Sequence, residues 1–86
     1  MKVVLHRRFK KQYKKLRQAE QRRFKERRDL FLQNPSHPLL ENHPLHYEYT
    51  GCRSINVGGD LRAIFREVTP NLVLFVRIGT HTELYG

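Results

Sequence analysis

Apolar residues in the first part of the chain recur at the spacing of one helical face. Phe9, Tyr13 and Leu16 lie four and then three positions apart, and lysine and arginine fill most of the positions between them. This pattern predicts an amphipathic helix over residues 7–18. The apolar, β-branched stretch of residues 2–6 before it is typical of a short strand.

A second helix is predicted over residues 20–33, where Phe24 and Phe31 lie seven positions apart. Pro35 ends it, because a residue that precedes proline is biased away from helical backbone angles. No glycine or proline separates the two helical segments. The break near residues 18–19 therefore rests on a shift in the phase of the pattern, and a single bent helix is the alternative.

The remainder of the chain is predicted to be a loop followed by strands. Three of the four prolines fall in residues 34–45, which indicates a loop. Beyond it, apolar and alternating runs are separated by turn residues such as Gly58-Gly59 and Thr69-Pro70-Asn71. The predicted strands cover residues 46–50, 52–57, 61–68 and 72–78.

The run Leu72–Val76 is apolar at every position, which is typical of a central strand buried on both faces. The tail over residues 82–86 is too short for an element of its own. The predicted order is β-α-α-β-β-β-β in a single domain over residues 1–86. Two helices packed on one side of an antiparallel sheet make this a two-layer α+β fold.

Charge is concentrated in the predicted helices. Residues 1–33 hold 13 Lys and Arg against 3 acidic residues, whereas residues 34–86 hold 4 against 5. A basic half of this density indicates a polyanionic or acidic partner, with a solvated helix face as the ordinary alternative. The single cysteine, Cys52, and the lack of an apolar run of about 18 residues predict a cytoplasmic protein without a disulfide or membrane segment.

Familiar metal-binding and catalytic motifs are absent from the sequence. The five histidines match no tetrahedral zinc spacing and no cysteine pair accompanies them, so we expect neither a metal nor a cofactor. Gly58-Gly59 lies between two strands, so it is interpreted as a turn and not as a phosphate-binding loop. No local signature supports a Ser-His-Asp triad.

Polar residues with useful chemistry gather at the predicted strand ends. His43 precedes the sheet, Asp60 and Arg62 follow the glycine turn, and His81 and Tyr85 follow the last strand. If neighbouring strands bring these ends together, the group suits RNA cleavage without a metal. Histidine transfers protons near neutrality, arginine binds phosphate oxygens, and tyrosine stacks on a base. Taken singly, each residue also has an ordinary role in a turn, on the surface or in the core.

Further residues are candidates for binding the substrate. They are Asn56 at the glycine turn and the basic residues Arg53, Arg77, Lys10 and Lys14. Each Lys or Arg that neutralises a phosphate adds about 0.7–0.9 to the salt slope of binding, so the basic helices fit a nucleic acid. They also fit an acidic, partly disordered protein that folds on contact.

Several motifs together resemble one family. His43-Pro44-Leu45, Gly51-Cys52-Arg53, the stretch GDLRAIFR over residues 59–66 and the ending GTHTELYG over residues 79–86 are similar to the YafQ branch of the RelE/ParE toxin superfamily. The closing motif is the most specific of these. The resemblance extends over essentially the whole chain.

This resemblance implies a toxin of a type II toxin–antitoxin pair. RelE-like members cleave mRNA in the ribosomal A site without a metal, and a protein antitoxin neutralises them. The expected partners are therefore a cognate antitoxin, mRNA and the 30S A site of the ribosome. One alternative is a ParE-like inhibitor of DNA gyrase, which has the same fold and cleaves no RNA. Another is a non-catalytic, basic nucleic-acid-binding module.

The resemblance also assigns roles to the residues that match its motifs. His81 is the expected general acid, and His43 or Asp60 the expected base, although acid and base could be exchanged. Arg62 is expected to stabilise the transition state at phosphorus. Tyr85 is expected to position the nucleotide.

The chain departs from the family pattern at two positions. Asn56 stands where histidine is more frequent, so this position can bind or orient a substrate but cannot transfer a proton. Leu61 stands where tryptophan is common, which weakens the expected packing on the substrate.

Overall fold

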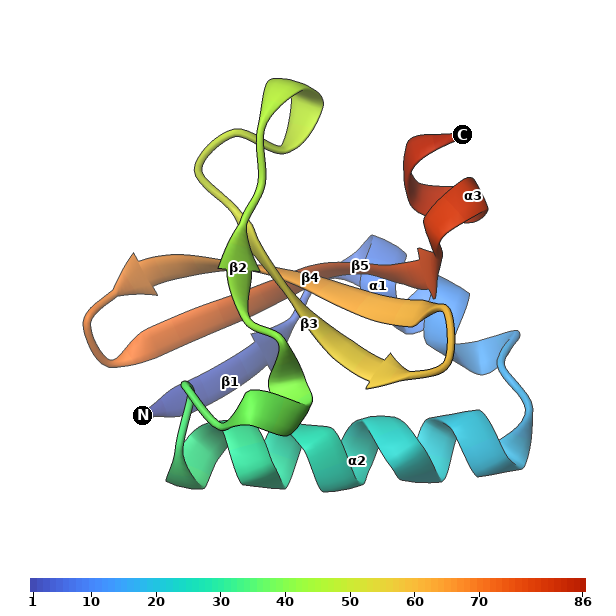
Figure 1. The fold of residues 1–86 in the computed structure, drawn as a ribbon, viewed down its shortest axis with the longest axis horizontal. Coiled ribbons are helices and arrows are strands. Elements are labelled where there is room, and N and C mark those ends of the chain that lie inside the picture. Colours follow the sequence, from blue (N-terminus) through green and yellow to red (C-terminus); the bar gives the residue numbers. More distant parts are fainter.

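A five-stranded sheet with helices against one face forms the body of the protein (Figure 1). The computed structural model describes the whole chain, residues 1–86. The helices are α1 (Arg7–Lys14), α2 (Gln18–Gln33) and α3 (His81–Tyr85), and there are two 3-10 helices, η1 (Pro38–Leu40) and η2 (Tyr47–Tyr49). The strands are β1 (Lys2–Leu5), β2 (His43–Pro44), β3 (Arg53–Gly58), β4 (Leu61–Thr69) and β5 (Leu72–Thr80).

Two separate helices follow β1, as the phase shift predicted. α1 ends at Lys14, four residues before the predicted boundary, and α2 begins at Gln18. The turn between them is closed by two reciprocal bonds, because the Tyr13 hydroxyl donates to the Gln21 carbonyl (3.1 Å) and the Gln21 amide donates to the Tyr13 carbonyl (2.9 Å). No helix of the structure is both long and apolar enough to cross a membrane.

The aromatic residues of the two helical faces pack on the sheet. Phe9, Phe24 and Phe31 are buried, as the spacing predicted. Their rings meet Phe65 and Phe75 of β4 and β5 at centroid distances of 4.9–5.9 Å, mostly in tilted or edge-on geometry. Full burial of one such side chain contributes roughly 1.5–3 kcal/mol, so this cluster holds the helical layer on the sheet.

The sheet has the strand order β1-β5-β4-β3-β2, and four of its strands are antiparallel neighbours. β1 is the exception: it pairs parallel to β5, from Lys2 opposite Leu72 to Leu5 opposite Phe75. The rest of the sheet is antiparallel, as predicted, and the sequence pattern did not specify the direction of this edge strand. A short apolar strand carries no pattern that reveals its direction, which long-range pairing decides.

Residues 46–50 do not form the predicted strand. They contain η2, in which Tyr47 has a positive φ of 59° and is 94% exposed. The strand lies earlier, at β2, inside the segment predicted to be a loop. Because His43 of β2 pairs antiparallel with Ser54 of β3, the residues between the two strands must reverse the chain.

β5 is an interior strand, as its apolar run predicted, but only one of its faces is fully buried. Val73 and Phe75 face the helices and are buried, whereas Leu72, Leu74 and Val76 are half-buried on the other face. No helix packs over that stretch of the open face (Figure 1).

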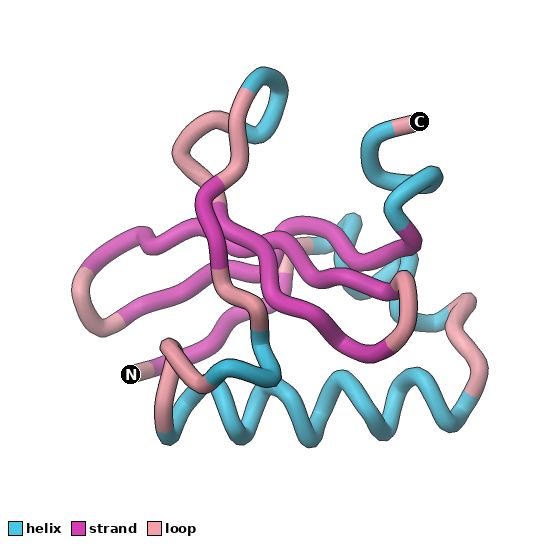
Figure 2. The backbone as a smooth tube through the Cα atoms, viewed as in Figure 1, coloured by secondary structure: helices cyan, strands magenta, loops and turns pink.

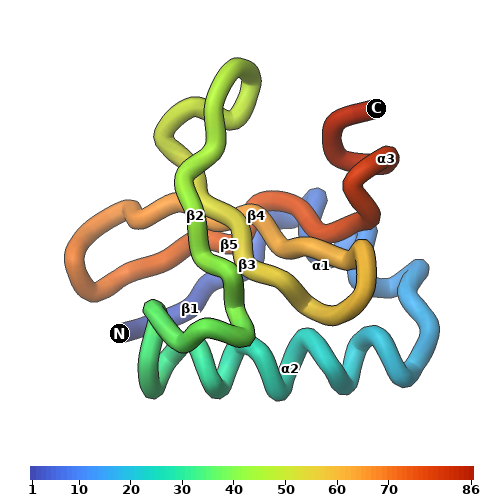
Figure 3. The backbone as a smooth tube through the Cα atoms, viewed as in Figure 1, coloured from blue at the N-terminus to red at the C-terminus, as the bar shows by residue number.

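The C-terminal residues form a helix, contrary to the prediction that they are too short for an element. Thr80 caps α3 reciprocally with Glu83: its hydroxyl accepts from the Glu83 backbone N–H (3.3 Å), and the Glu83 carboxylate accepts from the Thr80 N–H (2.8 Å). Such a capping box stabilises the start of a helix. Figure 2 shows that α3 and the β2–β3 connection both project from the sheet on the side away from α2. Figure 3 places the C-terminus on that side.

Candidate active site

An open pocket of about 270 Å³ lies where β2, β4 and α3 meet. Its lining residues are His43, Leu45, Arg62, His81 and Tyr85. Four of the five residues predicted to be catalytic therefore come together, and Asp60 is the one that does not line the pocket. The register explains this convergence, since Leu61 at the start of β4 pairs with Thr80 at the end of β5.

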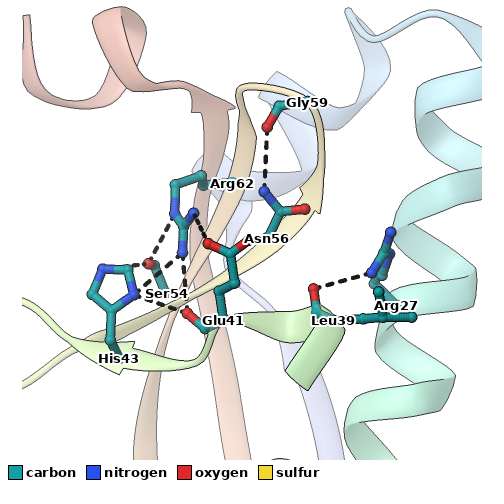
Figure 4. Close-up of polar contacts among 8 residues, drawn as sticks. All are labelled: Arg27, Leu39, Glu41, His43, Ser54, Asn56, Gly59 and Arg62. Atoms are coloured by element: carbon teal, nitrogen blue, oxygen red, sulfur yellow. Dashed lines mark hydrogen bonds and ion pairs between the residues drawn. The ribbon is translucent and has the colours of Figure 1, made fainter. Parts of the chain in front are cut away.

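Arg62 is the most enclosed charged group in the pocket, with 14% of its side chain exposed. Its Nε donates to the Ser54 hydroxyl (3.1 Å) and its Nη2 to the Glu41 carbonyl (3.2 Å), as Figure 4 shows. Its Nη1 lies 4.0 Å from the Glu41 carboxylate, which is 66% exposed. Because the carboxylate is exposed and the distance is long, this ion pair contributes little, and a phosphate oxygen can replace the carboxylate without a large loss.

His43 is fixed by groups on both sides of its ring. Its Nδ1 lies 2.8 Å from the Glu41 carbonyl oxygen and its Nε2 lies 3.5 Å from the Ser54 hydroxyl. A carbonyl oxygen only accepts, so Nδ1 carries the proton and the lone pair of the neutral ring is on Nε2. The 3.3 Å approach of Arg62 Nη2 to Nδ1 follows from this, because both groups donate to the same carbonyl.

The shared carbonyl of Glu41 is placed by an unusual backbone conformation. Glu41 ends η1 with a φ of 46°, in the left-handed region that costs a non-glycine residue about 1–2 kcal/mol. The preceding segment is tied to α2, since Arg27 Nη1 donates to the Leu39 carbonyl (3.1 Å), a bond also visible in Figure 4. Unfavourable backbone geometry of this kind concentrates at functional sites.

The opposite wall of the pocket is built from aromatic contacts. His81 opens α3, and its ring centroid lies 4.9 Å from that of Tyr85. Tyr85 meets Tyr49 edge-on at 5.5 Å, and the Tyr49 hydroxyl donates to the Leu84 carbonyl (3.0 Å). The β2–β3 connection therefore holds α3 in place, although the sequence pattern had placed Tyr49 in a strand.

Burial alters the acidity of the two tyrosines. It raises the pKa of the Tyr85 phenol above its ordinary value, and the nearby positive charge of Arg62 opposes this only partly. Burial also raises the pKa of Tyr49. Both phenols are therefore neutral at physiological pH, and Tyr85 presents a stacking surface and a hydrogen-bond donor, not an anion.

Asp60 and Asn56 belong to the β3–β4 hairpin. Asp60 is exposed in the two-residue turn, next to Leu61 and thus at the same end of the sheet as α3. Asn56 pairs with Arg62 in register, but its amide donates to the Gly59 carbonyl (3.2 Å) and closes the turn. The structure thus gives Asn56 a local role in the hairpin, whereas Asp60 is an exposed turn residue.

None of the predicted basic binding residues lines the pocket. Arg53 Nε donates to the Asn42 side chain (2.7 Å) and borders a neighbouring hollow beside Cys52. Arg77 is half-buried on β5, and its Nη1 donates to the Val76 carbonyl (2.6 Å). Lys10 and Lys14 are exposed on α1.

Two groups that organise the pocket escaped prediction, namely Ser54 and the backbone of Glu41. Ser54 is completely buried and is the buried polar residue that joins Arg62 to His43. A signal for it exists in the sequence, since Ser54 alternates with Ile55 in β3 and so faces the open side of the sheet. The Glu41 carbonyl has no such signal. No group of three or more His, Cys, Asp or Glu is arranged to hold a metal ion.

The fold matches solved toxin structures over nearly its full length. A crystal structure of YafQ from Escherichia coli strain BL21(DE3) shares 26% identity at a TM-score of 0.83, with 99% of this chain and 98% of that chain covered. The E. coli DinJ-YafQ toxin–antitoxin complex also matches, at 26% identity, a TM-score of 0.67 and 99% and 97% coverage. A YoeB/ParE toxin from Agrobacterium tumefaciens, at 15% identity, a TM-score of 0.77 and 94% and 99% coverage, shares the fold alone. No curated protein matches the chain in sequence.

The likeness to YafQ defines the class as a small toxin of a toxin–antitoxin pair, and the YoeB/ParE and RelE structures share its fold. Within it, a family model described as the bacterial toxin of the type II toxin–antitoxin system, YafQ, matches residues 1–86. The chain belongs to this YafQ toxin family.

Proposed function

We propose that this toxin is an endoribonuclease that cleaves mRNA in the ribosomal A site. The observation that supports the proposal is the meeting of His43, Arg62, His81 and Tyr85 in one pocket. Proton donors and acceptors and a guanidinium serve phosphodiester cleavage, and an aromatic ring stacks on a base of the RNA. A gyrase inhibitor or a passive binding module has no use for this combination.

In the proposed reaction, the 2′-hydroxyl of one nucleotide attacks the adjacent phosphorus. His43 takes the 2′ proton on Nε2, the nitrogen that keeps its lone pair when Nδ1–H donates to the Glu41 carbonyl, and the 2′-hydroxyl replaces the long 3.5 Å contact from the Ser54 hydroxyl. His81 gives a proton to the 5′ oxygen as the P–O5′ bond breaks. The products are a 2′,3′-cyclic phosphate and a 5′-hydroxyl, so atoms and charge balance without a further reactant.

Arg62 and Tyr85 act on the substrate without exchanging protons. The Arg62 guanidinium faces the charge that grows on the phosphoryl oxygens, where a preorganised cation acts most strongly. The Tyr85 ring stacks on a base next to the cleaved bond, because its phenol remains neutral and its edge contacts hold the ring in one orientation. Asp60 stays the alternative base, to be tested beside His43.

Two partners are part of the proposal. The first is a cognate antitoxin protein, because the structurally similar YafQ forms a complex with DinJ. The second is the ribosome, which presents mRNA to the pocket. The basic N-terminal third of the chain, with 13 Lys and Arg against 3 acidic residues, suits either a nucleic acid or an acidic protein.

The terminal groups of the RNA fragments provide a direct test of the proposed reaction. The purified toxin is incubated with ribosomes that carry a defined mRNA, and the fragments are examined for their terminal groups. We expect new 5′-hydroxyl ends and 2′,3′-cyclic phosphates inside the A-site codon. Intact mRNA combined with arrest of DNA supercoiling by gyrase would instead support a ParE-like activity. Intact mRNA without any arrest would support the passive binding module.

A further inference from the structure

Another hollow on the surface is lined by four cationic side chains and one amide. It measures about 280 Å³ and lies between α1 and β5, and we call it the basic hollow. Its lining residues are Arg8, Lys11, Gln12, Lys15 and Arg77. None of them is acidic or apolar, and the three ion pairs of the structure include none of the four cations. Their positive charges are gathered without compensation, at a cost in mutual repulsion.

The fold holds this arrangement in place. β1 pairs with β5 only as far as Phe75, so the edge of β5 beyond it has no neighbouring strand. α1 covers that edge, and the Gln12 side-chain oxygen accepts from the backbone N–H of Ile78 (2.9 Å). Arg8 and Lys11 of α1 and its C-cap residue Lys15 lie at positions i, i+3 and i+7, so they form one stripe beside the edge, the α1 stripe. One acidic group, Glu83, lines the adjoining hollow together with Lys15, and its carboxylate accepts a hydrogen bond from the Thr80 N–H.

Arg77 connects the basic hollow to the cleavage pocket. In the β4–β5 register Arg62 pairs with Gly79 and Ile64 pairs with Arg77, so Arg77 is the diagonal neighbour of Arg62 on the same face. Such diagonal neighbours lie roughly 7–8 Å apart. The positive charge of Arg77 also acts on the phenol of Tyr49, whose ring meets Tyr85 in the pocket wall. An anionic chain that leaves the pocket past Arg62 therefore meets Arg77 and then the α1 stripe.

We propose that Arg8, Lys11, Lys15 and Arg77 bind backbone phosphates of the RNA strand that enters or leaves the cleavage pocket. This inference rests on the proposed function of the pocket. An acidic protein segment is the less suitable occupant, because a segment that folds on contact needs apolar surface to bury and the basic hollow offers none. Phosphates need only cations and amide donors, which Gln12 can supplement with its free N–H₂ group.

The salt dependence of RNA binding tests this site without any need for cleavage. The His81→Ala protein is titrated with a fluorescein-labelled single-stranded RNA of 12 nucleotides across a range of KCl concentrations. The double variant Lys11→Gln and Lys15→Gln is compared with Arg22→Gln and Lys25→Gln, which removes the same charge from exposed positions of α2. The first pair is expected to lower the slope of log affinity against log salt by about 1.4, at about 0.7 per lost phosphate contact. The second pair is expected to leave the slope unchanged.

Three results would contradict the proposed binding of RNA phosphates at the basic hollow. The first is an equal change of slope in both double variants, since only net charge would then matter. The second is no change in either, or no measurable RNA binding by the parent protein at low salt. The third is a selective loss of binding to an oligoglutamate of equal charge while RNA binding is kept, which would assign the basic hollow to an acidic protein. None of these binding measurements depends on RNA cleavage. A result against the phosphate-binding site can therefore be distinguished from a result against the proposed reaction.

Discussion

The two walls of the pocket are held by different forces. On one wall, His43 and Arg62 are fixed by hydrogen bonds to Ser54 and to the Glu41 carbonyl, within strands of the sheet. On the other, His81 belongs to the five-residue helix α3, which aromatic packing and one bond from Tyr49 hold in place. No hydrogen bond within the chain fixes the His81 ring, and the residue is exposed.

This contrast indicates how the two histidines divide the work. A base must present its lone pair before the reaction begins, which suits a ring whose tautomer is set by a short bond to a carbonyl. An acid must lose a proton and regain it from solvent, which suits an exposed ring on a chain end. Preorganisation on rigid strands is worth most for the groups that face the developing charge.

Substitution of Arg62, on the hydrogen-bonded wall of the pocket, is expected to have the largest effect on activity. Arg62→Ala should lower the rate constant of RNA cleavage by roughly 10²–10³, the range found when a preorganised charge-stabilising donor is lost. Single-turnover cleavage of ribosome-bound mRNA measures this. Arg62→Lys is the matched control: it keeps the charge and loses the planar fork, so only partial recovery is expected. Full activity of the alanine variant would contradict the role.

Substitution of Tyr85 removes an aromatic ring from the other wall, which α3 and Tyr49 form. Tyr85→Ala should weaken binding of the substrate in the cleavage reaction by roughly 5- to 150-fold, since stacking of one base is worth about 1–3 kcal/mol. Tyr85→Phe should retain most of the activity, because the hydroxyl makes no bond in the proposed reaction. Equal losses in the two variants would show that the hydroxyl, not the ring, matters.

Ser54 offers a sharper test of the fixed wall. Ser54→Ala removes the acceptor of Arg62 Nε and the neighbour of His43 Nε2, and should lower the turnover number about 10-fold with little change in KM. ¹⁵N NMR of the His43 ring in the free protein should show a weaker preference for the Nδ1–H tautomer. The exposed Ser36→Ala is the control. A drop in activity with an unaltered ring signal would mean that Ser54 acts only through general stability.

The smallest expected effect is a change in the free energy of unfolding at alkaline pH, where Tyr49 and Tyr85 lose their protons. Tyr49 and Tyr85 have raised pKa values in the folded protein, so the folded state retains their protons at a pH where the unfolded state has lost them. The free energy of unfolding should therefore fall as the pH rises above about 10. Tyr49→Phe should flatten this fall in urea titrations at several pH values. An unchanged pH dependence would contradict the assigned shift.

Much of the fold could be predicted because local patterns and tertiary structure agree. The helical faces of Phe9 and Phe24, and the hairpins around Gly59 and Pro70, appear in the structure. Gly58 illustrates the agreement, since its φ of 129° needs a glycine and the turn signal there was correct.

Prediction failed where distant pairing overrides local preference. The alternating residues 46–50 match a strand in isolation, but the pairing of His43 with Ser54 leaves them only the length to turn back. The convergence of His43, Arg62 and His81 could be expected from strand ends, since register brings such ends together. The role of the Glu41 carbonyl could not be expected from the sequence. Every residue has a backbone carbonyl, and only the conformation of the backbone decides which way it points.

The most direct test of the account is the expression of the wild-type toxin and of His81→Ala in bacteria, with the 5′ ends of mRNA mapped in each. The account predicts growth arrest with new mRNA ends that depend on translation in the wild type. It also predicts a loss of these ends by roughly 10²–10⁴ in the variant, the range for a lost proton donor. Equal cleavage by the two proteins would contradict the assignment of His81, and arrest with intact mRNA would contradict the ribonuclease itself.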